Sequence, residues 1–428
     1  MKRKMNIYKK AVVLILAGII VFSTISVIGG ADDTNYTKVQ KIDENEIIFD
    51  KIINFLMSLA HFPSLSTCII KNNEVVWSRG YGFYDLEQEK TTSNDTIYNV
   101  GSISKTITGT ALMQLYEQGL FNLDDDVNEY LPFSLRNPNF HDVPITFRML
   151  LCHSSGLAPE IIIEDYHPWY WFNFSNDPPF SFYPYPWITE YLQPGGKWYD
   201  PPSYGYWNPQ DKPGEYHVYA NINYDIVAYL VQILSGESFI EYCNKHIFIP
   251  LEMHNSSFNL SKLPIEFVAI PYHFSKGEYL TMDMLPGFAD STYHRLLHYP
   301  VAGLYTTVMD LSHFLIAHMN GGVWNDVRIL QEETVVEMHT IQPPDFDDSS
   351  EVDYGLAWME MDYSFCREKL SGHSGGYYGV WTFMYYFYSE PDIGVIFFVN
   401  NLPNSETLFS NPGSLLLFTI LYQKALRV

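Results

Sequence analysis

The order of strand and helix patterns along the chain constrains its fold most. Alternating or β-branched segments lie near the start, at 65–70 and 75–80, and near the end, at 379–387 and 393–400. Helix-type apolar spacing occupies the rest, at 47–59, 102–118, 147–152, 223–234, 239–247, 308–319, 332–339 and 414–425. This order predicts an α/β (α+β) fold: an antiparallel sheet built from both chain ends and flanked by helices, with a mostly helical lobe inserted between them.

Size and charge exclude several classes of protein. The chain has 428 residues, of which 47% are hydrophobic and 16% aromatic, so it can bury a substantial core. Lys and Arg total 25 against 49 Asp and Glu, a formal net charge of −24. Such a charge repels phosphate backbones, so we expect no nucleic-acid partner. The four cysteines form no C-x-x-C pair and are expected to be buried thiols.

The N-terminus resembles an export signal. Basic residues at 2–4 and 9–10 precede an apolar run at 11–28, and small residues follow at 29–31. This pattern predicts that 1–31 is a signal peptide or an N-terminal membrane anchor. Either alternative makes the protein extracytoplasmic, secreted or attached to the cell membrane through 11–28. The pattern leaves cleavage open.

The chain contains one Ser-x-x-Lys, formed by Ser102 and Lys105 where an extended segment gives way to a helix pattern. On a helix these positions share a face, so the Lys105 amine is expected one turn above the Ser102 oxygen. If the helix begins at Ser102, the hydroxyl also lies at the positive end of the helix dipole. A lysine that loses its charge by desolvation can activate a serine. The alternative is a capping serine followed by a surface lysine.

Two further motifs follow in order. Tyr219 and Asn221 stand two apart at a loop–helix junction, where a cation such as Lys105 could lower the pKa of the phenol. The segment 372–376, Gly-His-Ser-Gly-Gly, precedes the strand pattern at 379–387. Small residues beside an edge strand leave backbone N–H groups free to bind an oxyanion.

In this order the three motifs resemble the serine β-lactamase and penicillin-binding-protein superfamily, and its class C-type branch in particular, which includes esterases and D-amino-acid peptidases. The likeness runs from about Leu65 to Asn401. Supporting stretches are 80–82, 123–125, 145–157, 249–253 and 300–310. The resemblance implies a β-lactamase/transpeptidase-like domain at 40–428. Its sheet lobe would span about 40–100 and 300–428, and its helical lobe about 106–299.

The resemblance also implies a role for each motif residue. Ser102 would be the acyl-accepting nucleophile, Lys105 would share its proton, and Tyr219 would be the general base. Asn221 would hold the substrate or Lys105. The backbone N–H groups of Ser102 and Gly376 would form the oxyanion hole. Substrate would also bind His373, Ser374 and Gly375, which take the place of the family's Lys-Thr-Gly.

The exchange of lysine for His373 bears on the substrate. A histidine is mostly neutral at pH 7, so it holds a β-lactam carboxylate less firmly than lysine does. We therefore expect an acyl-enzyme hydrolase acting on a carboxylic ester or a D-amino-acid peptide-like amide, without cofactor or metal. Its partner would be a small-molecule or peptide substrate; the oligomeric state stays open. A β-lactamase, a DD-carboxypeptidase and a non-turnover sensor of cell-wall peptides or lactams remain alternatives.

Three other sequence features bear on the function. The motif at 372–376 also fits a Gly-x-Ser-x-Gly nucleophile elbow centred on Ser374, but a helix should then follow it. His294 and His298 have a zinc-like spacing without an evident third ligand. The aromatic and proline-rich insertion at 161–216 lies outside the resemblance and is either a self-packed loop or a lid or substrate wall.

Overall fold

The computed structural model describes most of the chain from residue 44 onwards. The described residues are 44–157, 188–189, 192–193, 195–196, 207, 210–285, 292–293, 296, 298–344, 352–363, 368–387, 393–402 and 412–428. The export segment at 1–31, most of the insertion at 161–216, His294 and Cys366 lie outside them.

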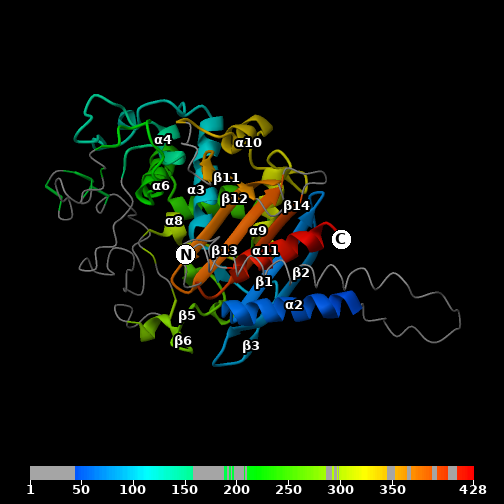
Figure 1. Cartoon of the computed structure of the whole chain (residues 1–428). Helices are drawn as coiled ribbons and strands as arrows, with labels where there is room; N and C mark the ends of the chain where they lie inside the picture. The colour runs from blue at the N-terminus through cyan, green and yellow to red at the C-terminus, as the bar shows by residue number, and fades with distance from the viewer. Residues whose placement is uncertain are drawn as a thin grey trace, which may run out of the picture.

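An eight-stranded antiparallel sheet made from both ends of the chain forms the centre of the molecule (Figure 1). Its strands follow the spatial order β10 (Val352–Tyr354), β11 (Met359–Tyr363), β12 (Glu368–Tyr377), β13 (Val380–Phe387), β14 (Ile393–Val399), β1 (Ser64–Lys71), β2 (Glu74–Asp85) and β3 (Lys90–Thr91). β1 pairs with β14 from Leu65 opposite Val399 to Lys71 opposite Ile393, which joins the two chain ends. The predicted fold class is confirmed.

The two faces of the sheet are both covered. On one face, helices α2 (Glu44–Ala60) and α11 (Pro412–Ala425) pack side by side over Phe383, Phe397 and their neighbours (Figure 1). On the other face, Met384 and Phe398 join a larger core with α3 (Ser104–Glu117), α6 (Ile222–Ser235) and α9 (Val308–Met319). Because β13 and β14 are buried on both faces, they read as nearly continuous apolar runs.

The remaining elements surround this core. The shorter helices are α4 (Phe147–Leu151), α7 (Phe239–Cys243), α8 (Tyr299–Ala302) and α10 (Glu332–His339). Three two-stranded ribbons pair β4 (Tyr98–Asn99) with β7 (Tyr305–Thr306), β5 (Tyr272–Ser275) with β6 (Glu278–Thr281), and β8 (Val323–Trp324) with β9 (Val327–Arg328). None of the helices within the described residues has both the length and the apolarity needed to cross a membrane.

Three local predictions need correction. The α-helix begins at Ser104, and Ser102 lies in the preceding 3-10 turn η1 (Gly101–Ile103). The predicted helix at 239–247 changes after Cys243 into a π-helical turn, Asn244–Phe248. The motif at 372–376 does not precede an edge strand as predicted; it lies within β12, an internal strand with neighbours on both sides. Glycine-rich composition hid this strand, which forms because β11 and β13 pair with it on either side.

The position of Ser374 also excludes the nucleophile elbow. Ser374 lies within β12, opposite Phe383, and the next element is the strand β13. An elbow serine would stand at a sharp turn from a strand into a helix.

Candidate active site

Ser102 is held at the start of α3 by a network of backbone and side-chain hydrogen bonds. Gly101 precedes it in the left-handed region, at φ +54°, and its N–H donates to Asn99 Oδ1 at 3.0 Å. The Ser104 hydroxyl donates to the Gly101 carbonyl at 2.6 Å and accepts from the Leu304 N–H at 3.0 Å. These bonds fix the turn, so the half-buried Ser102 hydroxyl has a defined position.

Lys105 is a buried amine directed at that hydroxyl. Its Nζ lies 3.0 Å from Ser102 Oγ and 3.0 Å from the carbonyl oxygen of Val301 on α8. The expected stacking of the amine one turn beyond the serine is therefore present. Because the side chain is wholly buried, the alternative of a surface lysine is wrong.

Tyr219 reaches the same place from a distant part of the chain. Its ring centroid lies 5.0 Å from Lys105 Nζ and 6.4 Å from the His373 ring. Asn221 is half-buried and precedes the first residue of α6, at the predicted loop–helix junction. The structure thus brings the predicted serine, lysine and tyrosine together, with Asn221 two residues beyond the tyrosine.

The glycines of β12 allow the strand to pack directly on the serine-bearing turn. A Cβ on Gly375 would lie 2.0 Å from the Val100 carbonyl oxygen and 2.4 Å from Thr382 Oγ1. A Cβ on Gly101 would lie 3.2 Å from Gly375 Cα and 3.4 Å from Gly376 N. The Gly376 backbone nitrogen therefore lies beside Gly101, the residue that precedes Ser102. An oxyanion hole built from the backbone N–H groups of Ser102 and Gly376 requires this proximity.

His373 lies on β12 opposite Met384, so its side chain faces the core that contains α3. The side chain is 2% exposed. Burial, and then the nearby Lys105, lower the pKa of His373 to about 3, although its hydrogen bond to the Ser374 carbonyl opposes the shift. That carbonyl accepts from Nδ1 at 2.6 Å, so the neutral ring presents Nε2 as an acceptor.

Sequence reasoning missed a histidine beside Tyr219. The His153 and Tyr219 ring centroids lie 4.4 Å apart, with the ring planes tilted by 36°. Nδ1 of His153 accepts from the Ala220 N–H and Asn223 Nδ2, each at 3.3 Å. Burial, and then Lys105, hold the pKa of His153 well below its usual value. His153 belongs to the stretch 145–157 that supported the resemblance, but no pattern in it predicted contact with Tyr219.

The described residues show no candidate metal centre. No three His, Cys, Asp or Glu side chains among them converge as metal ligands would. Cys68, Cys152 and Cys243 are buried free thiols. His298, one of the pair with zinc-like spacing, instead binds Asp225 Oδ2 through Nδ1 at 2.5 Å.

The antiparallel sheet and its covering helices, with a serine and a buried lysine at their junction, define the class as the β-lactamase and penicillin-binding-protein superfamily of serine hydrolases. The chain belongs to the Beta-lactamase family, whose sequence profile matches residues 49–417. The predicted resemblance to this superfamily is confirmed.

Three proteins show how similar this chain is to others. "Protein flp" of Staphylococcus aureus is 28% identical over 271 residues, which are 63% of this chain and 48% of that protein. This chain thus spans about half the length of that curated relative. An octameric penicillin-binding protein homologue from Pyrococcus abyssi matches with a TM-score of 0.64 and 27% identity, over 90% of this chain and 77% of that one. The D-amino acid amidase from Ochrobactrum anthropi has a TM-score of 0.67 over 90% of this chain and 99% of that one; at 19% identity it supports the fold alone.

Proposed function

We propose that this chain is an exported serine hydrolase that forms an acyl-enzyme on Ser102 with an ester or amide substrate. The observation that carries the proposal is the contact of Lys105 Nζ with both Ser102 Oγ, at 3.0 Å, and the Tyr219 ring, at 5.0 Å from its centroid. A buried amine and a phenol next to a serine hydroxyl are the groups that can remove its proton.

The reaction would proceed in two steps. Ser102 Oγ attacks the substrate carbonyl while its proton passes to the Lys105–Tyr219 pair. The backbone N–H groups of Ser102 and Gly376 hold the developing oxyanion. The alcohol or amine leaves with a proton, and an ester between the acyl group and Ser102 remains. Tyr219 then takes a proton from water, which attacks this ester; the bond from the acyl carbon to Ser102 Oγ breaks, Oγ regains a proton from the Lys105–Tyr219 pair, and the acid is released. Asn221 orients the substrate or Lys105.

The environment of His373 favours a substrate without a carboxylate at that point. With a pKa lowered to about 3, chiefly by burial, the ring carries no positive charge at neutral pH. The formal net charge of −24 disfavours anionic substrates as well. A carboxylic ester or a D-amino-acid peptide-like amide fits these charges better than a β-lactam or a peptide with a terminal carboxylate.

Export belongs to the same proposal. The basic and apolar N-terminal segment, 1–31, would direct the protein out of the cytoplasm and either be removed or anchor it.

A non-turnover sensor of cell-wall peptides or lactams is the second candidate function, because such a sensor needs only the acylation of Ser102.

The test uses purified full-length protein with p-nitrophenyl esters, D-alanyl peptides with an amidated C-terminus and a chromogenic cephalosporin. We expect turnover of an ester or a D-alanyl peptide to exceed that of the cephalosporin, with an acyl group on Ser102 detected by mass spectrometry. Ser102→Ala should lower turnover by roughly 10³-fold or more without changing the unfolding temperature. Ser261→Ala, which alters an exposed hydroxyl, is the control.

The alternatives have distinct outcomes. Stable acylation of Ser102 without release of product would support the sensor. Full turnover by the Ser102→Ala variant would remove Ser102 from the mechanism.

A further inference from the structure

A histidine two residues before Tyr219 contacts two carbonyl oxygens. His217 Nδ1 lies 2.7 Å from the Cys152 carbonyl oxygen, and His217 Nε2 lies 2.8 Å from that of Pro344. A carbonyl oxygen can only accept a hydrogen bond, so both ring nitrogens must donate. A neutral imidazole has one N–H, whereas an imidazolium has two. The two contacts are therefore satisfied together only when His217 is a cation.

We propose that His217 is a positioning residue for Tyr219: its doubly protonated ring joins the Tyr219 segment to the Cys152 and Pro344 carbonyls and so fixes the phenol beside Lys105. This inference rests on the proposed function, in which Tyr219 moves protons. His217 does not itself touch the reacting atoms.

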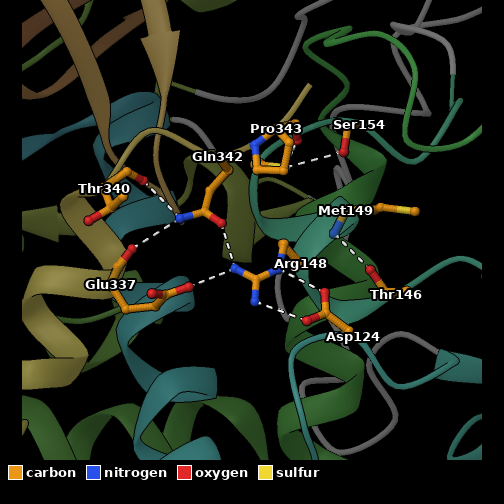
Figure 2. Close-up of polar contacts among 10 residues, drawn as sticks. Asp124, Thr146, Arg148, Met149, Ser154, Glu337, Thr340, Gln342 and Pro343 are labelled. Atoms are coloured by element: carbon orange, nitrogen blue, oxygen red, sulfur yellow. Dashed lines mark hydrogen bonds and ion pairs between the residues drawn. The ribbon is translucent and has the colours of Figure 1, made fainter. Parts of the chain in front are cut away.

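The two carbonyls that His217 binds belong to segments that Arg148 already joins (Figure 2). From α4, the Arg148 guanidinium binds both carboxylate oxygens of Asp124, at 2.8 and 3.1 Å, as well as Glu337 Oε1 at 2.6 Å and Gln342 Oε1 at 2.5 Å. Gln342 Nε2 donates in turn to the Thr340 carbonyl at 2.8 Å. α4 ends just before Cys152, and Gln342 lies two residues before Pro344.

The two carbonyls that accept from His217 therefore lie in segments that the hydrogen bonds and ion pairs of Arg148 hold together. Near them, the Cys152 thiol lies 3.9 Å from the Pro343 carbonyl oxygen. A ring that donates to both segments has little freedom to turn. Its two hydrogen bonds also restrict the backbone that follows His217.

His153 transmits this position to Tyr219. Its carbonyl accepts from the Val218 N–H at 2.8 Å, and its Nδ1 accepts from the Ala220 N–H. The residues before and after Tyr219 are thus both bonded to His153, while His217 is bonded to Cys152, which precedes His153. Tyr219 is held from both sides.

The two histidines have opposite protonation requirements. Nδ1 of His153 accepts hydrogen bonds, so it carries no proton, and positive charge on His217 lowers the pKa of His153 further. Tyr354 of β10 stacks on His217 at 6.0 Å between ring centroids, and burial raises the pKa of this phenol, so it is uncharged at neutral pH. Two other titratable groups lie in the segment whose carbonyl His217 contacts: Cys152, whose pKa burial raises to about 11, and Arg148.

The first experiment reads the protonation of His217 directly. In full-length protein labelled with ¹⁵N-histidine, with the signal assigned by its loss in His217→Gln, we expect two protonated ring nitrogens near pH 6. A ring with one protonated nitrogen there would overturn the proposal. This result does not depend on finding a substrate.

The second experiment compares turnover of the ester or peptide found above as a function of pH. His217→Gln cannot supply a cation, so we expect kcat near pH 6 to fall about tenfold with little change in KM. The ratio of wild-type to variant kcat should approach one at the higher pH at which the ¹⁵N signal of the wild-type ring shows a single protonated nitrogen. A purely structural role would give the same ratio at every pH and would overturn the proposal.

His313→Gln is the matched control. His313 is also half-buried and contacts a backbone carbonyl, that of Leu251, through Nδ1 at 2.8 Å, but it lies on α9 and stacks on Trp324. We expect its kcat ratio to stay near one at both pH values. A doubly protonated His217 in a protein without Ser102-dependent turnover would support the two hydrogen bonds from the His217 ring to the Cys152 and Pro344 carbonyls. It would contradict the proposed function instead.

Discussion

At the scale of single residues, burial decides which groups carry charge near Ser102. Lys105 and His373 lie close enough that the lysine helps to lower the pKa of the histidine, and burial lowers it more. The result is a neutral ring where the family's third motif has a lysine. His373 can accept a hydrogen bond through Nε2, but it offers no fixed charge to an anionic substrate.

His373→Lys tests this difference. A lysine at this position would supply a cation, so we expect KM for the chromogenic cephalosporin to fall about tenfold relative to His373→Gln, in line with a charge-assisted hydrogen bond. KM for a neutral p-nitrophenyl ester should change little between the two variants. Circular dichroism would verify that both fold. Equal KM values for the cephalosporin would contradict the role assigned to the missing charge.

At the scale of elements, the contact between β12 and η1 brings the sheet to the serine. Gly101 and Gly375 meet there, and Thr382 of β13 donates to the Val100 carbonyl at 2.7 Å on the same side. A side chain between strand and turn would separate the Gly376 N–H from Ser102. The close approach therefore depends on the absence of a Cβ at Gly375, whereas Gly101 also needs a left-handed φ that other residues rarely adopt.

Two neighbouring glycines provide a matched pair of substitutions. Gly375→Ala places a methyl group 2.0 Å from a backbone oxygen, so we expect β12 to shift and kcat to fall roughly a hundredfold. Gly376→Ala would meet Leu402 Cδ1 at 3.5 Å, an ordinary contact, and keeps its backbone N–H. We expect this variant to stay near wild-type activity. Similar losses in the two variants would argue against the close approach as the cause.

At the scale of the whole molecule, buried neutral histidines make the fold sensitive to acid. Burial is the main cause that lowers the pKa of His153, His318 and His373, the last to about 3. An unfolded histidine titrates near ~6.5. Between these values the unfolded chain binds a proton that the folded chain does not, so stability falls as the pH falls from about 6.5 towards 3.

Urea unfolding at pH 7 and pH 5 measures this effect. We expect the free energy of unfolding to decrease on acidification, with His373 contributing on the order of 2 kcal/mol at pH 5. The decrease should be smaller in His373→Gln by about that amount, whereas His141→Gln, at an exposed position, should retain the full decrease. An unchanged pH dependence in His373→Gln would show that this ring is not held neutral.

The sequence by itself determined the sheet from both chain ends and the position of most helices. Local periodicity carries that information: 308–319 and 332–339 became α9 and α10 without change. It also marked Ser102 and Lys105 as one unit, because residues three apart share a helix face whatever surrounds them. The placement of Tyr219 followed from resemblance, since no local pattern links it to Lys105.

Only the tertiary structure decided how the site is held. β12 forms because its neighbours pair with it, and neither its glycines nor His373 show a strand pattern. The contacts of His153 and His217 join segments distant in sequence, and the protonation of each ring depends on which atoms meet it. Periodicity describes one element at a time, whereas hydrogen-bond partners and burial are set by contacts between elements that a single stretch of sequence does not encode.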